Sequence, residues 1–329
     1  MQRKVLPELD CTSIRCSVYF SLHTIRRRND VSLKRVGEWL EVTVPKEWAN
    51  GTVFSFLTKK LGASKALIQK WNQSTAIKRN NTIADVNHKL EEKDRLYLHL
   101  FKEEEYGVLP ENVSVDILYE DDHLIIVNKP AGMDTHPNEP NQKGTLANAI
   151  AFYYQLNGIQ IRVRHIHRLD RDTSGAVIFA KHDLSQSILD QDLQVKKIKR
   201  TYLAIVKGKL SPLNGTIDKP IGRDRHHATR RRISPQGQKA ITHYKVEKYD
   251  PKSNLSILSL QLETGRTHQI RVHLSSINHP IIGDTLYGGS QDLIKRQALH
   301  AKQIALLHPL THENIIVEAD IPTDILSLL

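Results

Sequence analysis

The sequence predicts an α+β protein, with a mixed, mostly antiparallel β-sheet flanked by helices and a small α/β module before it. Short apolar strands outnumber helices and rarely alternate with them one for one, which disfavours a parallel doubly wound sheet. The alternation of leucines in "LSILSLQLET" (255–264) is typical of a half-buried strand. The pattern of apolar and polar residues also changes at Val115, where an apolar strand, an acidic turn and a buried strand ending at Pro130 begin a second domain.

Residues 1–49 are expected to be an N-terminal extension, partly flexible, and we assign no function to the first 30 residues. Within the extension, "EWLEVTVP" (38–45) reads as a strand. Residues 50–100 are predicted to form the small module, and the charge-rich residues 101–114 a linker.

The module is predicted to contain two short helices within 52–74, broken at Gly62, the second capped by Ser64. Short strands should follow within 75–101, around a turn at Asn80 and Asn81.

The remaining residues, 115–329, are predicted to form one larger domain. Its helices fit "GTLANAIAFYYQ" and "LSQSILDQDLQ". After the two strands near Val115, further strands are expected at 175–181, 201–208, 241–249 and 255–264.

The chain is basic, with 47 Lys and Arg against 36 Asp and Glu and a formal net charge of +11. The excess is concentrated in "IRRR", "KKIKR" and "RDRHHATRRR", which suits a polyanionic partner, although solvated surface runs would look the same. Two cysteines exclude a disulfide framework, and no stretch is long and apolar enough for a membrane span. We therefore expect a cytoplasmic protein without membrane contact.

The stretch "HRLDRDTSG" (167–175) places Asp170 between Arg168 and Arg171, in a loop that feeds a buried strand. Neighbouring guanidiniums favour the ionised form of a carboxylate. The residues alone leave three roles open for Asp170: a structural anchor, part of a metal site, or a nucleophile. The metal alternative would use Asp170 and Asp172 near His165 and His167, but the surrounding positive charge disfavours it.

Two other segments are candidates for chemistry. In "LETGRTHQIRVHL", Thr267 is expected to cap a helix, so that Arg266 lies where a strand meets a helix and can reach a carboxylate or phosphate. In "KIKRTYLAIVKG", Tyr202 opens an apolar strand behind a basic run, and is either a core residue or a flat surface for a base. The uneven spacing of His268, His273 and His279 indicates structural or RNA-facing roles rather than a zinc site.

These segments, with "DDHLIIVNKPAGM", "HPIIGDTLYG" and "LHA" in the same order, resemble the RluA-type pseudouridine synthases over about residues 115–315. The front module resembles the S4 RNA-binding domain, although the usual "VNG" hairpin is here "IKRNN". The resemblance implies the pseudouridine synthase fold and an enzyme that isomerises uridines of structured RNA. The basic loops and the S4-like module favour ribosomal RNA, and transfer RNA is the other possibility.

What the resemblance implies for single residues centres on Asp170, which matches the family's nucleophile. Attack at the ribose C1′ and attack at uracil C6 both stay open. Arg266 is expected to form an ion pair with Asp170, and Tyr202 to stack on a flipped-out uracil. The family's "K-x-Y" fits Lys199 poorly, and Arg200 takes the basic position instead.

Further residues are expected to bind RNA. Arg168 resembles the residue that fills the gap left by the flipped nucleotide, and 223–244 corresponds to an RNA-gripping loop. The full set of expected RNA-binding residues is Arg168, His167, Arg171, Arg200, Arg223, Arg230, Arg231, Lys65, Lys70 and Arg79.

The resemblance implies no cofactor and no metal, because uracil serves both as leaving group and as returning nucleophile. We expect a monomer. Two alternatives stay open: a binding protein that keeps the fold without chemistry, and a metal-dependent phosphohydrolase that uses Asp170 and Asp172.

Overall fold

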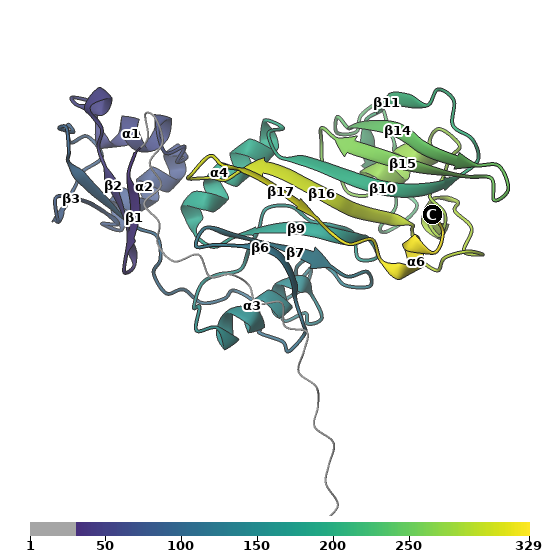
Figure 1. The fold of residues 1–329 in the computed structure, drawn as a ribbon, viewed down its shortest axis with the longest axis horizontal. Helices are drawn as coiled ribbons and strands as arrows, with labels where there is room; N and C mark the ends of the chain where they lie inside the picture. Colours follow the sequence, from purple (N-terminus) through teal and green to yellow (C-terminus); the bar gives the residue numbers. More distant parts are fainter. Residues whose placement is uncertain (1–30) are drawn as a thin grey trace, which may run out of the picture.

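The computed structural model describes residues 31–329, so the expectation of flexibility for the first 30 residues lies outside the described part of the chain. Figure 1 shows a small N-terminal module at one end of a long sheet that runs through the rest of the molecule. No helix between residues 31 and 329 is long and apolar enough to span a membrane.

The N-terminal module is a five-stranded sheet in the order β1-β2-β5-β3-β4, packed against two helices. Its elements are β1 (Leu33–Val36), β2 (Trp39–Thr43), α1 (Val53–Lys59), α2 (Lys65–Gln73), β3 (Ile77–Arg79), β4 (Thr82–Ile83) and β5 (Arg95–His99). The two predicted helices are confirmed, and the Ser64 hydroxyl caps α2 by accepting a hydrogen bond from the Leu67 amide at 3.3 Å. Asn80 and Asn81 form the predicted turn, both with positive φ.

The sheet of this module begins before residue 50, because β1 and β2 belong to it. The strand predicted at 38–45 is thus confirmed as β2, whose Leu40 and Val42 enter the core. Strand β1 has no buried position, so its sequence carries no apolar alternation that would have predicted it.

The larger domain is built on a ten-stranded sheet whose main path is β11-β14-β15-β10-β16-β9-β7-β6. Among the described strands of this sheet, β9 and β16 form the one parallel pair and the other pairs are antiparallel, which confirms the predicted mixed, mostly antiparallel sheet. Its strands are β6 (Asp116–Glu120), β7 (Leu124–Lys129), β8 (Arg164–His165), β9 (Ser174–Ala180), β10 (Lys199–Lys207), β11 (Asn214–Asp218), β14 (Ile241–Asp250), β15 (Leu255–Leu262), β16 (Leu299–Leu307) and β17 (Asn314–Glu318). A separate hairpin is formed by β12 (Ile221–Arg223) and β13 (Arg231–Ile233).

Helices cover both faces of this sheet, because successive strand residues point to opposite sides. On one face, α3 (Leu146–Leu156) and α5 (Gln269–Ser275) share a core with Ile125 and Val127 of β7. On the other, α4 (Asp183–Gln194) packs through Leu189 on Leu124 and Ile126 of the same strand. The last helix, α6 (Thr323–Leu326), lies near the C-terminus (Figure 1).

Helix α4 also joins the N-terminal module to the larger domain. Its Leu184 and Ile188 are buried in the hydrophobic core of the module. The Trp71 indole donates a hydrogen bond to Asp183 Oδ2 at 3.1 Å. The two parts therefore share a core rather than meeting only through the linker.

Candidate active site

The loop that carries Asp170 runs between β8 and β9 and is held by its own backbone. The Thr173 amide donates to the Asp170 carbonyl at 3.0 Å, which closes a turn. The buried Thr135 hydroxyl both accepts from the Leu169 amide at 3.0 Å and donates to the Leu169 carbonyl at 3.1 Å. The backbone on either side of the carboxylate is thus fixed.

A buried lysine at the end of β7 anchors the same loop. Lys129 Nζ donates to the carbonyls of Pro130 at 2.8 Å, Met133 at 2.6 Å and Arg171 at 2.9 Å. Burial lowers the pKa of Lys129 to about 7, although nearby carboxylates such as Asp170 act in the opposite direction. Nothing in the local pattern of "NKPAGM" predicts this role for its lysine.

Gly175, the last residue of "HRLDRDTSG", lets β9 approach β16 closely. It has φ +116°, and a Cβ at this position would lie 2.3 Å from the Ala301 carbonyl oxygen. Only glycine fits this contact. The glycine of the motif therefore places the loop through sheet packing rather than through chemistry.

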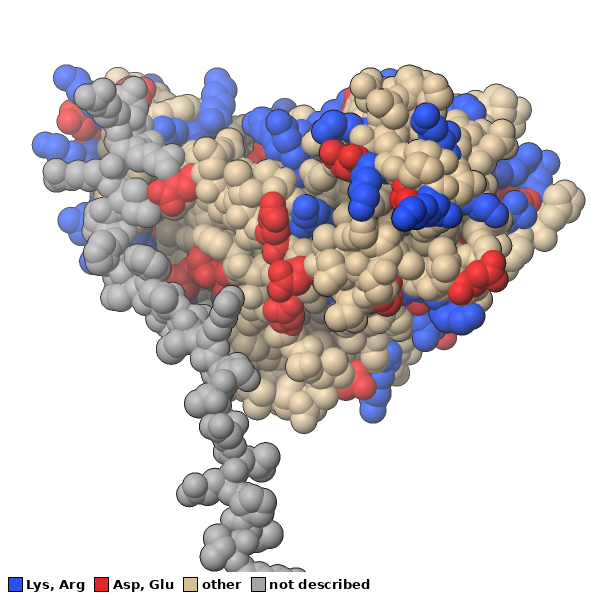
Figure 2. Space-filling view, turned by 45° about the vertical axis from the view of Figure 1, so that its right-hand side comes forward, with Lys and Arg blue, Asp and Glu red and all other residues tan. Residues whose placement is uncertain are grey.

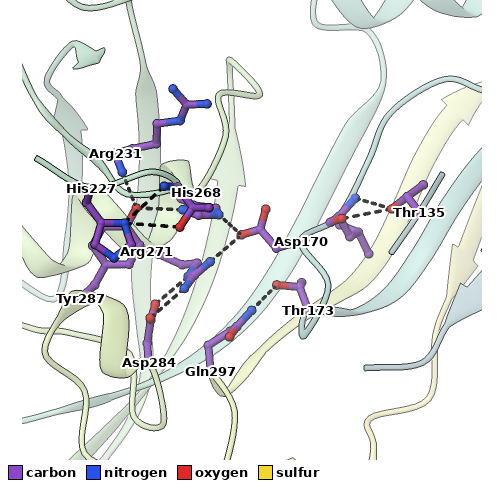
Figure 3. A network of polar contacts seen from close by, with 12 residues as sticks. Thr135, Asp170, Thr173, His227, Arg231, His268, Arg271, Asp284, Tyr287 and Gln297 are labelled. Atoms are coloured by element: carbon purple, nitrogen blue, oxygen red, sulfur yellow. Dashed lines mark hydrogen bonds and ion pairs between the residues drawn. The ribbon is translucent and has the colours of Figure 1, made fainter. Parts of the chain in front are cut away.

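The carboxylate of Asp170 forms an ion pair with Arg271 of α5, at 3.1 Å between Oδ2 and Nη1 (Figure 3). Arg271 is held in turn by the buried Asp284, with Nε to Oδ2 at 2.7 Å and Nη2 to Oδ1 at 2.9 Å. Burial works against the charge of Arg271, but the two carboxylates outweigh it and raise its pKa above the ordinary value. Asp284 thus leaves one guanidinium nitrogen for Asp170, whose side chain is 19% exposed.

Two further side chains complete this network. His268 Nε2 lies 4.0 Å from Asp170 Oδ2, and its Nδ1 is 2.8 Å from the Tyr287 hydroxyl. The same hydroxyl accepts a hydrogen bond from the Arg231 amide at 2.9 Å (Figure 3). Burial lowers the pKa of His268, so this ring is neutral at pH 7.

Asp170 opens onto a cavity of about 440 Å³ between β10, α5 and its own loop. This is the size range of sites for small molecules. Tyr202 and Arg200 of β10 line the cavity with Asp170, and both are buried. Burial raises the pKa of the Tyr202 hydroxyl, which therefore keeps its proton at neutral pH.

The expected ion pair between Asp170 and Arg266 is wrong, because the partner of Asp170 is Arg271. Arg266 is exposed at the edge of the cavity, and its Nε donates to the Lys239 carbonyl at 3.0 Å. Arg271 lies inside the first turns of α5, on its buried side.

The predicted cap by Thr267 is also wrong, since the N-cap of α5 is the next residue. Its N-cap is His268, in a left-handed conformation and without a side-chain capping bond. Gln269 takes over the fixing of this loop: its Oε1 accepts from the Thr264 hydroxyl at 2.8 Å and from the Arg266 amide at 3.0 Å. Arg271 is one of the buried residues of this helix.

The other predicted RNA-binding residues of these loops and strands fall into an exposed group and a buried group. Arg168 and Arg171 are exposed, and Arg171 Nε donates to the Gly132 carbonyl at 3.2 Å. His167 is buried, and burial together with the charge of Arg200 lowers its pKa well below the ordinary value. Lys199 is exposed while Arg200 points inward, which fits the reading of the motif as "R-x-Y".

The hairpin β12-β13 carries the expected RNA-gripping arginines. Arg223 and Arg231 are cross-strand partners, and Arg230 lies 3.9 Å from Asp224. Figure 2 shows lysine and arginine side chains spread along the upper part of the face in view, with acidic side chains among them.

The expected RNA-binding cations of the module have different surroundings. Lys65 is exposed at the start of α2. Lys70 lies 3.7 Å from Asp183 of the larger domain. Arg79 pairs with the buried Asp94 at 2.5 Å, so its guanidinium is already used within the module.

The histidines beyond the Asp170 network have structural contacts. The ring nitrogens of His273 lie 2.9 Å from the Thr242 hydroxyl and 2.9 Å from the Lys219 carbonyl. His279 Nδ1 lies 2.9 Å from the Lys207 carbonyl. Within residues 31–329, no group of three or more His, Cys, Asp or Glu side chains is placed to hold a metal ion.

Comparison with known proteins adds two family matches and several relatives. Residues 123–276 match the model of the RNA pseudouridylate synthases, and residues 40–96 match that of the RluD ribosomal pseudouridine synthase N-terminal domain. The chain is 51% identical over 296 residues to the RNA pseudouridine synthase YhcT of Bacillus subtilis, covering 90% of this chain and 98% of that protein. It is 38% identical over 285 residues to the ribosomal large subunit pseudouridine synthase D of Haemophilus influenzae, covering 81% and 86%.

A solved structure of the same family has a similar fold. Human RNA pseudouridylate synthase domain containing 1 matches with a TM-score of 0.52 and 26% identity, over 63% of this chain and 83% of that one. The fold, the ordered motifs and the relatives agree, and the chain belongs to the RNA pseudouridine synthases, enzymes that isomerise uridine within RNA.

Proposed function

We propose that this enzyme converts uridines of structured ribosomal RNA into pseudouridine, with Asp170 as the nucleophile on a nucleotide flipped out into the cavity. The observation that carries the proposal is the ion pair of Asp170 with Arg271 at the wall of a cavity that Tyr202 also lines. Ribosomal RNA is favoured because the relative from Haemophilus influenzae is named for the large ribosomal subunit.

Each residue has a physical task in this proposal. Arg271 pairs with the carboxylate of Asp170 and aims it, as a carboxylate nucleophile requires. Asp170 attacks C1′ or C6, the N-glycosidic bond breaks, and the base turns so that C5 bonds to C1′. Tyr202 stacks on the uracil, which offsets part of the cost of flipping.

The exposed arginines hold the RNA around the flipped nucleotide. Arg168 and Arg266 line the cavity, where phosphates would pass, and Arg171 is exposed in the same loop as Asp170. The exposed Arg223 and Arg230, the half-buried Arg231 and the module's Lys65 extend this surface, and the module helps to dock the folded RNA.

The test is an isosteric change of the nucleophile. Asp170→Asn and Asp170→Ala should abolish pseudouridine formation on in vitro transcripts of large-subunit ribosomal RNA, while RNA affinity stays within a few-fold. Asp172→Asn is the matched control, since this carboxylate belongs to the same loop but does not line the cavity. Turnover by both Asp170 variants would remove the nucleophile assignment.

Two additions to this assay test which class of RNA is the substrate and whether the reaction requires a metal ion. Transfer RNA transcripts serve as the second substrate, and modification of these alone would overturn the ribosomal assignment. Activity in EDTA equal to that in buffer is expected, and loss that Mg²⁺ restores would favour the metal-dependent alternative.

A further inference from the structure

Three arginines are buried among the described residues, and one of them has no carboxylate. Arg164, Arg200 and Arg271 are 7%, 7% and 8% exposed. Arg164 pairs with Glu104, and Arg271 pairs with Asp170 and Asp284. Within residues 31–329, Arg200 forms no ion pair with a carboxylate, and its buried Nε has no hydrogen-bond partner. A buried charge without an opposite charge is strongly unfavourable, which indicates that a ligand supplies the missing anion.

Arg200 lies on the wall of the Asp170 cavity. Arg200 and Tyr202 are two residues apart on β10 and therefore face the same side of the sheet. A Cβ on Gly265 would lie 3.4 Å and 3.5 Å from the two terminal nitrogens of Arg200, so the guanidinium rests against this glycine. The neighbouring His167 and Tyr202 are neutral, because burial lowers the pKa of His167 and raises that of Tyr202. The unpaired positive charge at this buried wall is therefore that of Arg200, since Arg271, which also lines the cavity, is paired with Asp170 and Asp284.

Only the base of a flipped nucleotide can reach this wall. The phosphates on both sides of the target continue into the RNA chain, so they stay at the mouth of the cavity, near exposed side chains such as Arg168 and Arg266. Uracil is neutral before the reaction. When Asp170 bonds to C1′, the C1′–N1 bond breaks and its electron pair stays on the base. The resulting negative charge is shared by O2 and O4. Addition of Asp170 to C6 places negative charge on O4 in the same way. The charge disappears when C5 bonds to C1′ with release of the carboxylate, C5 loses its proton and N1 gains one.

We infer that Arg200 is the counter-charge of the uracil: it binds the carbonyl edge of the base and stabilises the negative charge that develops there during the isomerisation. This rests on the proposed function, since the base must enter the Asp170 cavity. A positive charge that is already in place where negative charge will develop stabilises the transition state efficiently, because no solvent has to reorganise during the reaction.

The test varies both the charge and the leaving group. The ribosomal or transfer RNA transcript that the wild-type enzyme modifies is made once with uridine and once with 5-fluorouridine. Fluorine at C5 stabilises the uracil anion, so this base depends less on Arg200. Single-turnover consumption of the target nucleotide is measured, because C5 of the fluorinated base has no proton to lose.

We expect Arg200→Met to slow consumption of uridine about 100-fold and that of 5-fluorouridine about tenfold, the size of effect that a single charge-stabilising donor has. The ratio of the two rates therefore shifts about tenfold from wild type. Arg200→Lys, which keeps the charge, should restore part of both the rate and the ratio. The melting temperature of Arg200→Met should equal or exceed that of wild type, because an unpaired buried charge has been removed.

Arg164→Met is the matched control, an equally buried arginine that does not line the cavity. It should lower the melting temperature by leaving Glu104 unpaired, and leave the rate ratio at its wild-type value. Equal slowing of both substrates by Arg200→Met, or a large drop in its melting temperature, would assign Arg200 a structural role and overturn the inference. If Arg200→Met instead weakened RNA binding but left the rate at saturating RNA unchanged, Arg200 would be a phosphate ligand. The slope of the logarithm of the binding constant against the logarithm of the salt concentration would then be smaller by about one. Failure of the proposed function is separate, since it appears as turnover by the Asp170 variants.

Discussion

At the scale of single residues, the chemistry of the cavity depends on how one guanidinium is shared. Arg271 gives two nitrogens to Asp284 and one to Asp170. Because the contact with Asp284 is bidentate and buried, it fixes the direction in which the third nitrogen points. We therefore expect Asp284 to be a positioning residue, which acts on Asp170 through Arg271.

We expect Asp284→Asn to reduce turnover roughly tenfold or more, because small displacements of a reacting group are costly. RNA affinity should change little, since Asp284 is buried and does not line the cavity. Rates at saturating RNA, compared with the dissociation constant from filter binding, check this. A variant that binds RNA poorly but turns over normally would contradict the positioning role.

The identity of the arginine partner was beyond the reach of the sequence alone. "GRTHQIR" contains two arginines, and the expected cap at Thr267 placed Arg266 at the junction of strand and helix. The helix starts at Gln269 instead, and this start depends on hydrogen bonds from Gln269 to β14 and to the preceding loop. The apolar neighbours Ile270, Val272 and Leu274 were a weak signal for a buried Arg271, but they do not identify its carboxylate.

At the scale of elements, the strands that local pattern predicts are those with apolar alternation or apolar runs. Strands β9, β10, β14 and β15 and helices α3 and α4 were predicted because these patterns are local. Strand β16 was missed although it is central, because His300, Lys302 and Gln303 interrupt its apolar residues. Its place between β10 and β9 is set by tertiary pairing, which a single sequence does not reveal.

The parallel contact between β9 and β16 leads to a prediction about Gly175. Gly175→Ala should destabilise the fold by at least about 2 to 3 kcal/mol, because the new methyl group meets the backbone of Ala301 and cannot be accommodated by a rotamer change. Gly158→Ala is the control, with φ +66° and nothing within 4 Å of its Cβ. It should cost about 1 kcal/mol from backbone strain alone. Urea unfolding of both variants compares the two, and equal losses would show that the close approach is not what requires glycine.

At the scale of the whole molecule, buried histidines make stability depend on pH. Burial lowers the pKa of His123 to about 4, although Asp121 and Asp122 act against it and Lys181 and His308 act with it. Burial also lowers the pKa of His165 to about 4. In the unfolded chain these rings take up protons near pH 6.5, so the unfolded state binds more protons between pH 6.5 and 4. Stability contributed by the neutral rings is present above that range and is lost as the pH falls through it.

We therefore expect the free energy of unfolding to fall between about pH 7 and pH 4.5, with His123 alone contributing on the order of 2 kcal/mol. Asp121 does not interfere in this range: burial opposes its charge, but His308 and the other neighbours hold its pKa well below the usual value. Urea midpoints across this range test the prediction, with His123→Asn as the comparison. A midpoint that is flat with pH, or equally steep in the variant, would contradict it.

The shared core of α4 and the N-terminal module has a consequence for substrate choice. Leu184 and Ile188 of α4 lie in the core of the module. The module and the cavity are therefore held at a fixed distance from each other. An RNA gripped at both places must itself present a uridine at that spacing. The enzyme would then recognise its target by the three-dimensional shape of the RNA, and nucleotides of different sequence but equal spacing would be modified alike.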